Sequence, residues 1–190
     1  MKLIDSTFSR ELFFVAVLSC TVLVQSCEEP VEVEDGVGLI VPGRSIDGIK
    51  LGDSKETVEA KLGKAESGGI VDGLYRSWYA AEYVQGPHAG LTVYYVEINN
   101  QPGPVDELTV MSPYAGRTKE GIGINSALKM VHQVYGIPKK TPTRAEDAWI
   151  ADFYCFGGKK LEIHYKDSLV TTMSIGYFLP MTQDTSFPCE

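Results

Sequence analysis

The sequence contains one element twice: it reads GRSIDGIKLGDSKETVEAKLG at residues 43–63 and GRTKEGIGINSALKMVHQVYG at residues 116–136. The second copy follows the first at a constant offset of 73 positions, and six of the 21 aligned positions are identical. The identical pairs are Gly43/Gly116, Arg44/Arg117, Gly48/Gly121, Ile49/Ile122, Val58/Val131 and Gly63/Gly136. Because a repeat at a fixed offset indicates a copied supersecondary unit, the sequence predicts two related halves.

Each copy predicts a short helix that begins at a polar capping residue and ends at the glycine that closes the copy. In the first copy, Asp53 or Ser54 is placed to cap the helix. In the second copy, Asn125 or Ser126 takes that place. Helices of about nine or ten residues are marginal on their own, so we expect both to pack on a sheet.

Strands are predicted after each helix, because the segments that follow are rich in aromatic and β-branched residues with a period near two. These segments are 74–84, 91–98 and 105–111 in the first half and 148–156, 161–166 and 170–178 in the second. The sequence therefore predicts an α+β fold of two tandem repeats, at residues 43–115 and 116–180. Each repeat is expected to contain a short helix followed by about three antiparallel strands, with a pseudo-twofold relation between the repeats.

Residues 1–26 have the features of a signal peptide. Lys2 and Arg10 precede an apolar run at 12–24, which is too short to span a bilayer, since a spanning helix needs about 20 residues. The run leads to Cys27 in a context that resembles a bacterial lipobox. We predict that cleavage leaves Cys27 as a lipidated N-terminus, and that residues 27–42 form a tether between the membrane and the folded body.

Several alternatives stay open at this end of the chain: processing at Cys20, secretion without a lipid, and an uncleaved anchor. The stretch 28–35 contains five acidic residues, which are typical of a solvated spacer. Acidic residues after a lipidated cysteine also resemble the surface-export signal of some Gram-negative lipoproteins. We expect a lipid-anchored protein at the bacterial outer membrane or cell surface, with a periplasmic or secreted protein as the alternative.

Two cysteines outside the leader, Cys155 and Cys189, are disulfide candidates. Export would place them in an oxidising compartment, where an even number of cysteines is read as a bridge. Such a bond would hold the C-terminal tail at 181–190, because Cys189 is the penultimate residue. The alternative is one buried thiol and one exposed thiol, since sequence spacing does not show that two residues approach.

Charge and motifs argue against several classes of function. The formal net charge of −8 argues against a nucleic-acid partner, which needs a basic surface. His88, His132 and His164 are scattered without a metal-binding spacing, and no cofactor fingerprint is present, so we predict neither a metal nor a cofactor. A hydrolase that uses Ser126 and His132 stays open, although no G-x-S-x-G elbow supports it. We predict that the protein is not an enzyme.

Four residues are candidates for an interaction surface. Arg44 and Arg117 are each followed after three residues by an acid, and this is the charged pattern that both copies keep. It indicates either a surface ion pair of small energy or a repeated recognition arginine. Trp78 and Tyr79 lie in an aromatic-rich predicted strand, and exposed Trp and Tyr are favoured contact residues.

A glycine-bearing turn, a short helix with one key valine, a terminal glycine and an antiparallel sheet together resemble a known group. The stretches that carry the resemblance are 48–54, with Val58 and Gly63, and 121–124, with Val131 and 135–138. They are similar to the outer-membrane assembly lipoproteins of the BamE/SmpA type and to the repeats of β-lactamase inhibitor proteins.

The resemblance implies a protein-binding module that works through an exposed sheet face. We therefore predict a non-catalytic envelope lipoprotein with a protein-binding or scaffold role, whose partners are the membrane, through its lipid, and an unknown protein or envelope component. The alternatives are an inhibitor of a secreted enzyme and a small-molecule binder or uncharacterised hydrolase.

Overall fold

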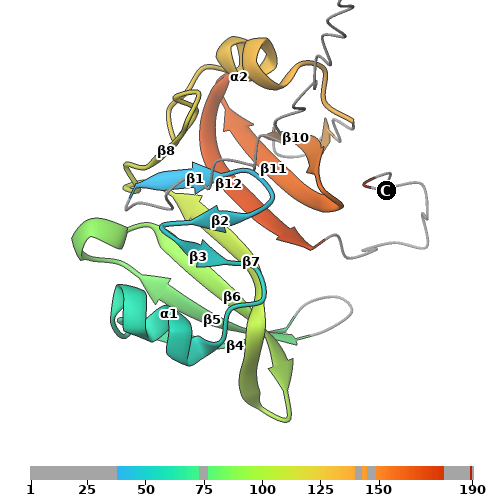
Figure 1. The fold of residues 1–190 in the computed structure, drawn as a ribbon. Helices are drawn as coiled ribbons and strands as arrows, with labels where there is room; N and C mark the ends of the chain where they lie inside the picture. The colour runs from blue at the N-terminus through green and yellow to red at the C-terminus, as the bar shows by residue number, and fades with distance from the viewer. Residues whose placement is uncertain (1–37, 73–76, 140–142, 145–148, 178–188, 190) are drawn as a thin grey trace, which may run out of the picture. The chain divides into compact units, whose positions relative to one another are not determined.

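The computed structural model describes residues 38–72, 77–139, 143–144, 149–177 and 189 (Figure 1). The predicted signal peptide, Cys27 and most of the acidic tether lie outside the described residues, as does the predicted tail apart from Cys189. Neither helix in the described part of the chain has the length and apolar character that a membrane crossing requires.

A large antiparallel sheet contains most of the strands in the described residues. Its eight strands lie in the order β4-β5-β6-β7-β12-β11-β10-β9, so β7 and β12 form the central pair. The strands are β4 (Ser67–Asp72), β5 (Ser77–Tyr83), β6 (Leu91–Ile98), β7 (Gln101–Met111), β9 (Thr143–Arg144), β10 (Trp149–Phe156), β11 (Lys159–Lys166) and β12 (Leu169–Tyr177). The central pair joins the two halves of the sequence through a ladder in which Thr109 lies opposite Ser174.

A small sheet and two helices lie on one face of the large sheet in the described structure (Figure 1). The small sheet has the strand order β3-β2-β1-β8, in which β1, just before the first copy, pairs antiparallel with β2 of the first copy and parallel with β8 of the second copy. Its strands are β1 (Leu39–Val41), β2 (Ser45–Ile46), β3 (Ile49–Lys50) and β8 (Arg117–Thr118), and the helices are α1 (Lys55–Leu62), α2 (Leu128–Tyr135) and the short 3-10 turn η1 (Gly86–His88).

The core forms between these elements and the inner face of the large sheet. Val58 of α1 and Val131 of α2, which are identical in the two copies, are both fully buried there. On β6, Leu91, Val93 and Tyr95 point into the same core, while Thr92 and Tyr94 alternate to the opposite face. The duplicated valine therefore serves packing in both copies.

The two helices end alike but begin differently. Gly63 and Gly136 end them with positive φ values of 83° and 77°, as predicted. Of the two predicted caps of α1, Asp53 and Ser54, the structure uses Ser54, whose hydroxyl accepts from the Thr57 N–H at 3.3 Å. The prediction for α2 is wrong, because its N-cap position is Ala127, which has no side-chain oxygen.

Pairing of the pre-helix segment with β12 explains this difference. The Asn125 N–H donates to the Val170 carbonyl at 2.8 Å, and the Leu128 N–H donates to the Ser168 carbonyl at 2.9 Å. The second bond holds Ala127 in an extended conformation at the N-cap position and supplies a partner for one of the N–H groups that the start of a helix leaves unpaired. The Ser126 hydroxyl accepts instead from the Gly123 N–H, inside the preceding turn.

The predicted fold class is corrected by this architecture. The protein is dominated by its sheets and is not an α+β tandem of two helix-plus-three-strand repeats. All eight strands of the large sheet are hydrogen-bonded into one layer, and the small sheet takes strands from both copies. Strand β4, with the sequence SGGIVD, was absent from the prediction because two glycines and no clear alternation obscure it.

Candidate functional site

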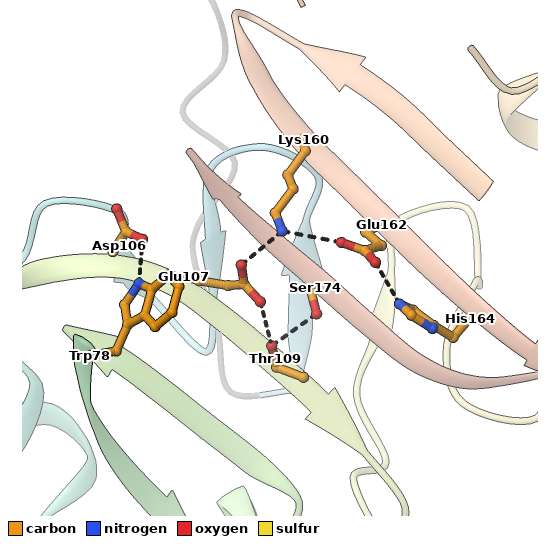
Figure 2. A network of polar contacts seen from close by, with 8 residues as sticks. All are labelled: Trp78, Asp106, Glu107, Thr109, Lys160, Glu162, His164 and Ser174. Atoms are coloured by element: carbon orange, nitrogen blue, oxygen red, sulfur yellow. Dashed lines mark hydrogen bonds and ion pairs between the residues drawn. The ribbon is translucent and has the colours of Figure 1, made fainter. Parts of the chain in front are cut away.

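The candidate site lies on the outer face of the large sheet, which we define as the face opposite the core. Cross-strand neighbours bring polar and aromatic side chains from four strands, β5, β7, β12 and β11, together on this face. Figure 2 shows the cluster, whose members are Trp78, Asp106, Glu107, Thr109, Lys160, Glu162, His164 and Ser174. The cluster spans the central β7–β12 pair, so neither half of the sequence contains it alone.

A β-bulge in β7 places two adjacent acids on the outer face. Tyr94 pairs with Glu107 and Tyr95 pairs with Val105, which leaves Asp106 as the extra residue. A bulge re-aims the side chains around it, and here Asp106 turns toward the outer-face Trp78. The indole Nε1–H donates to the Asp106 carboxylate at 3.1 Å and fixes the ring (Figure 2).

Lys160 links two glutamates across the centre of the face. Its Nζ lies 2.8 Å from Glu107 Oε2 and 3.1 Å from Glu162 Oε2 (Figure 2). Glu162 Oε1 in turn lies 2.6 Å from His164 Nε2. Gly176 pairs with both Lys160 and Glu107, and a Cβ at this position would lie 3.2 Å from Glu107 Cβ. The glycine therefore leaves room for the Glu107 side chain, which Lys160 contacts across β12.

Two hydroxyls extend the network on the other side of Glu107. Thr109 Oγ1 donates to Glu107 Oε1 at 3.2 Å and lies 2.8 Å from Ser174 Oγ. Because a hydroxyl carries one hydrogen, Thr109 donates to Glu107 and accepts from Ser174. A continuous chain of contacts thus runs from Ser174 to His164, and it holds every member in one arrangement.

The ion pairs move the pKa values of Glu162 and Lys160 away from neutrality. Burial opposes ionisation of Glu162, but the hydrogen bond from His164 and the charge of Lys160 outweigh it and lower its pKa to about 2. Burial also opposes the charge on Lys160, but Glu107 and Glu162 outweigh it and raise the pKa of the ammonium. Both groups are therefore charged throughout the physiological pH range.

Acid is expected to weaken the fold through Glu162. Its pKa is lowered from 4.5 to about 2 in the folded protein, so its contribution is present above pH 4.5 and is lost as the pH falls toward 2. Urea unfolding at a series of pH values should give the wild type a free energy of unfolding about 2–3 kcal/mol higher than that of Glu162→Gln at pH 5. This difference should disappear near pH 2. Glu120→Gln, at an exposed position, serves as the control. A gap that does not depend on pH would contradict the assignment.

A pocket of about 330 Å³ opens beside this network. The rings of Trp78 and Tyr94 and the half-exposed Val71 form its apolar part, and Glu107, Lys160 and His164 are among its polar lining. Ligand sites commonly combine aromatic walls with a few fixed polar groups in this way. Among the described residues, no group of three or more metal-binding side chains is assembled.

The predicted interaction residues separate in the structure. Trp78 joins the outer-face pocket, whereas Tyr79 points to the inner face, where it packs edge-on against Tyr95. Arg117 donates to the Gly121 carbonyl at 2.9 Å, and so stabilises the turn before α2. Arg44 lies in the turn before β2, outside the lining of the pocket.

The serine and histidine of the alternative hydrolase are used elsewhere. Ser126 is buried in the turn before α2 and bonds to Gly123 and Arg117. His132 Nε2 lies 2.6 Å from the buried carboxylate of Asp152 and ties α2 to β10. These contacts give both residues structural roles.

Most of the site was missed by sequence reasoning. The alternation of 161–166 did place Glu162 and His164 on one face, but it indicated ordinary surface. Glu107 and Ser174 come from strands far apart in the sequence, and only the β7–β12 pairing brings them together. The spacing of Lys160, Glu162 and His164 at alternate positions was the available signal.

The structure also joins Cys155 and Cys189 in a disulfide, with the Sγ atoms 1.94 Å apart. Cys155 lies opposite Lys160 in the β10–β11 ladder, so the bond anchors Cys189 at the edge of the outer face.

No protein-family model and no curated protein sequence matches the chain. Several solved structures match part of the chain at low sequence identity. A DUF4309 family protein (YjgB) from Bacillus subtilis is 14% identical, with a TM-score of 0.47 over 70% of this chain and 84% of that one. An extracellular protein containing a SCP domain from Bacillus anthracis is 11% identical, with a TM-score of 0.48 over 67% of this chain and 44% of that one.

A proposed β-lactamase inhibitor protein from Streptococcus mutans matches more weakly. It is 11% identical, with a TM-score of 0.25 over 64% of this chain and 81% of that one. The resemblance to β-lactamase inhibitor proteins thus has a weak structural counterpart, while the resemblance to the BamE/SmpA type stays a prediction. At these identities and TM-scores, none of the three structures assigns a function or a family to this chain.

Proposed function

We propose that the chain is a non-catalytic protein of the bacterial cell envelope that binds another protein on the outer face of its large sheet. The observation that carries this proposal is the fixed array beside the pocket: a continuous polar network next to the rings of Trp78 and Tyr94. Rings and charges that are already held in place lose little conformational entropy on binding. Tyr and Trp at the centre of a face are also the residues that most often dominate binding energy.

The charge states in the network favour binding over catalysis. A general acid or base works best when its pKa lies near the working pH. The ion pairs move the pKa of Glu162 down to about 2 and raise the pKa of Lys160. Neither group exchanges a proton readily near neutral pH, so neither is suited to general acid–base catalysis.

Photo-crosslinking tests whether a partner binds on the outer face, and not only whether the chain captures a protein. A benzophenone amino acid at Thr172, on the outer face, should crosslink to one main partner in envelope extracts, while the same probe at the exposed Lys129 of α2 should not. Trp78→Ala and Tyr94→Ala should each weaken that partner's binding by at least tenfold. Lys129→Ala is the matched control. A partner that Lys129 captures equally well, or that both aromatic variants retain, would overturn the proposal.

An inhibitor of a secreted enzyme is the second candidate, because the same face offers an aromatic and acidic pocket. The two candidates separate once the crosslinked partner is purified. If the partner is an enzyme, titration with the chain should abolish its activity at one equivalent, and Trp78→Ala should shift the curve to higher concentration. If the activity of the partner is unchanged at saturation, the inhibitor role is excluded and the scaffold role remains.

Export and lipidation of Cys27 are part of the proposal. The apolar leader and the cysteine that follows it support export, and the Cys155–Cys189 disulfide fits an oxidising compartment. Labelled palmitate should enter the wild-type chain and not Cys27→Ala, which should leave the membrane fraction. Cys20→Ala is the control, and it should keep both label and membrane. If Cys20→Ala loses the label and Cys27→Ala keeps it, the lipidated residue is Cys20 and the prediction for Cys27 is wrong.

A further inference from the structure

Building on the proposed function, we infer that the outer face recognises a basic side chain of its partner protein, a lysine or an arginine. The cation would lie against the rings of Trp78 and Tyr94 and within reach of the Glu107 carboxylate. Two adjoining pockets carry this inference. The pocket of about 330 Å³ described above and a second one of about 250 Å³ both include Tyr94 in their lining.

The charged groups that line these pockets are mainly acidic. They comprise the carboxylates of Glu82, Glu107 and Glu162 and the ammonium of Lys160, and these four groups together carry a formal charge of −2. Asp106 adds a further carboxylate behind the indole of Trp78. A partner segment with a positive charge is therefore attracted to the face, and a nucleic acid or an acidic segment is repelled.

The acidic groups are not spread evenly over the face. Lys160 lies between Glu107 and Glu162 on the β11 side, where it balances their charges. The side nearer β5 and β6 contains Glu82 and the two aromatic rings. Burial raises the pKa of Tyr94, and the carboxylates of Glu107 and Glu82 raise it further, as expected where the potential is negative. The position that suits a cation best is thus beside Tyr94.

The aromatic rings select how the cation is held. Lysine and arginine side chains bind favourably over the faces of Trp and Tyr rings, and the planar guanidinium also stacks on them. The hydrogen bond from Trp78 Nε1 to Asp106 fixes the indole without using its faces. A carboxylate beside these two rings accepts the N–H groups of the cation and leaves its alkyl stem against the apolar wall.

Peptide binding to the full mature chain tests this inference. The probe is a glycine/serine peptide with three arginines, and its matched forms carry three glutamines or three glutamates. Tryptophan fluorescence in a Trp149→Phe background reports on Trp78, because the chain has two tryptophans. The arginine peptide should bind at least tenfold more tightly than the glutamine peptide, and the glutamate peptide should not bind. Raising the salt concentration should weaken the binding of the arginine peptide.

Variants show whether the binding uses this face. Glu107→Gln and the exposed Glu82→Gln should each weaken the binding of the arginine peptide by at least fivefold. Glu120→Gln should leave this binding unchanged. Glu82→Gln keeps the test valid if Glu107→Gln does not fold. Equal binding of the arginine and glutamine peptides, or no effect of either variant, overturns the inference.

The same variants separate the inference from the proposed function. If the crosslinked partner binds Glu82→Gln and Glu107→Gln as tightly as wild type, the face binds a protein. The inference that it recognises a basic side chain is then wrong. If no partner crosslinks through Thr172 while the arginine peptide and free arginine amide bind alike, the cation site stands and the protein-binding function fails.

Discussion

Replacing Asp47 with alanine is expected to lower the free energy of unfolding by about 3–5 kcal/mol, because a buried group that joins three segments is removed. Asp47 is 6% exposed and lies in the turn between β2 and β3. Its Oδ1 accepts from the Gly38 N–H at 2.6 Å and from the Tyr114 hydroxyl at 2.7 Å, and its Oδ2 lies 2.7 Å from His88 Nδ1. The alanine would leave these polar groups buried without their acceptor.

The turn geometry adds to this loss. Asp47 and Gly48 form a two-residue hairpin loop with φ values of 52° and 73°. Aspartate tolerates this left-handed conformation better than alanine does. Asp47→Asn keeps the turn preference and one oxygen acceptor, so its cost should be smaller than that of Asp47→Ala. The difference between the two variants separates the lost contacts from the backbone strain.

The duplication supplies the control for this prediction. Glu120 stands at the position of Asp47 in the second copy, and its side chain is exposed. Glu120→Ala should therefore change the free energy of unfolding by no more than about 0.5 kcal/mol. Urea unfolding followed by circular dichroism measures all three variants. If Asp47→Ala costs less than about 1 kcal/mol, the cluster does not hold these segments together.

Loss of the Cys155–Cys189 disulfide is expected to cost about 4 kcal/mol. The two cysteines are 34 residues apart, and the loop that they close contains β11 and β12. Closing a loop of this length removes conformations from the unfolded chain, and the size of the effect follows from the loop length.

Two routes to the same state check this prediction. The double variant Cys155→Ala/Cys189→Ala and the wild type in a reducing agent should unfold at similar urea concentrations, both well below the oxidised wild type. Agreement between them shows that the cross-link is responsible and not the side-chain change. A cost below about 1 kcal/mol by both routes would contradict the prediction.

Local signals in the sequence predicted the parts of the fold that depend on neighbours along the chain. The serine of a capping pattern became the cap of α1, and a glycine after the last apolar residue ended each helix. The alternation in 161–166 placed Leu161, Ile163 and Tyr165 in the core. Each of these features follows from the backbone and side-chain chemistry of a few adjacent residues.

The errors arose where distant segments pair. The start of α2 was misplaced because a hydrogen bond from Leu128 to Ser168, just before β12, holds Ala127 extended at the N-cap position. The sequence left open whether the two repeats share one sheet, because no local pattern shows that β7 and β12 join edge to edge. The site was missed for the same reason, since Glu107 and Lys160 meet across a strand between them.

The sequence by itself determined the duplicated turn-and-helix element, the buried valines Val58 and Val131, and the leader that predicts export. Only the tertiary structure decided that the strands form one sheet and that its outer face gathers Trp78, Glu107 and Lys160. Periodicity records which face of an element is apolar, because that face is buried whatever lies against it. It does not record which strands become neighbours, because strand order depends on packing between segments far apart in the chain.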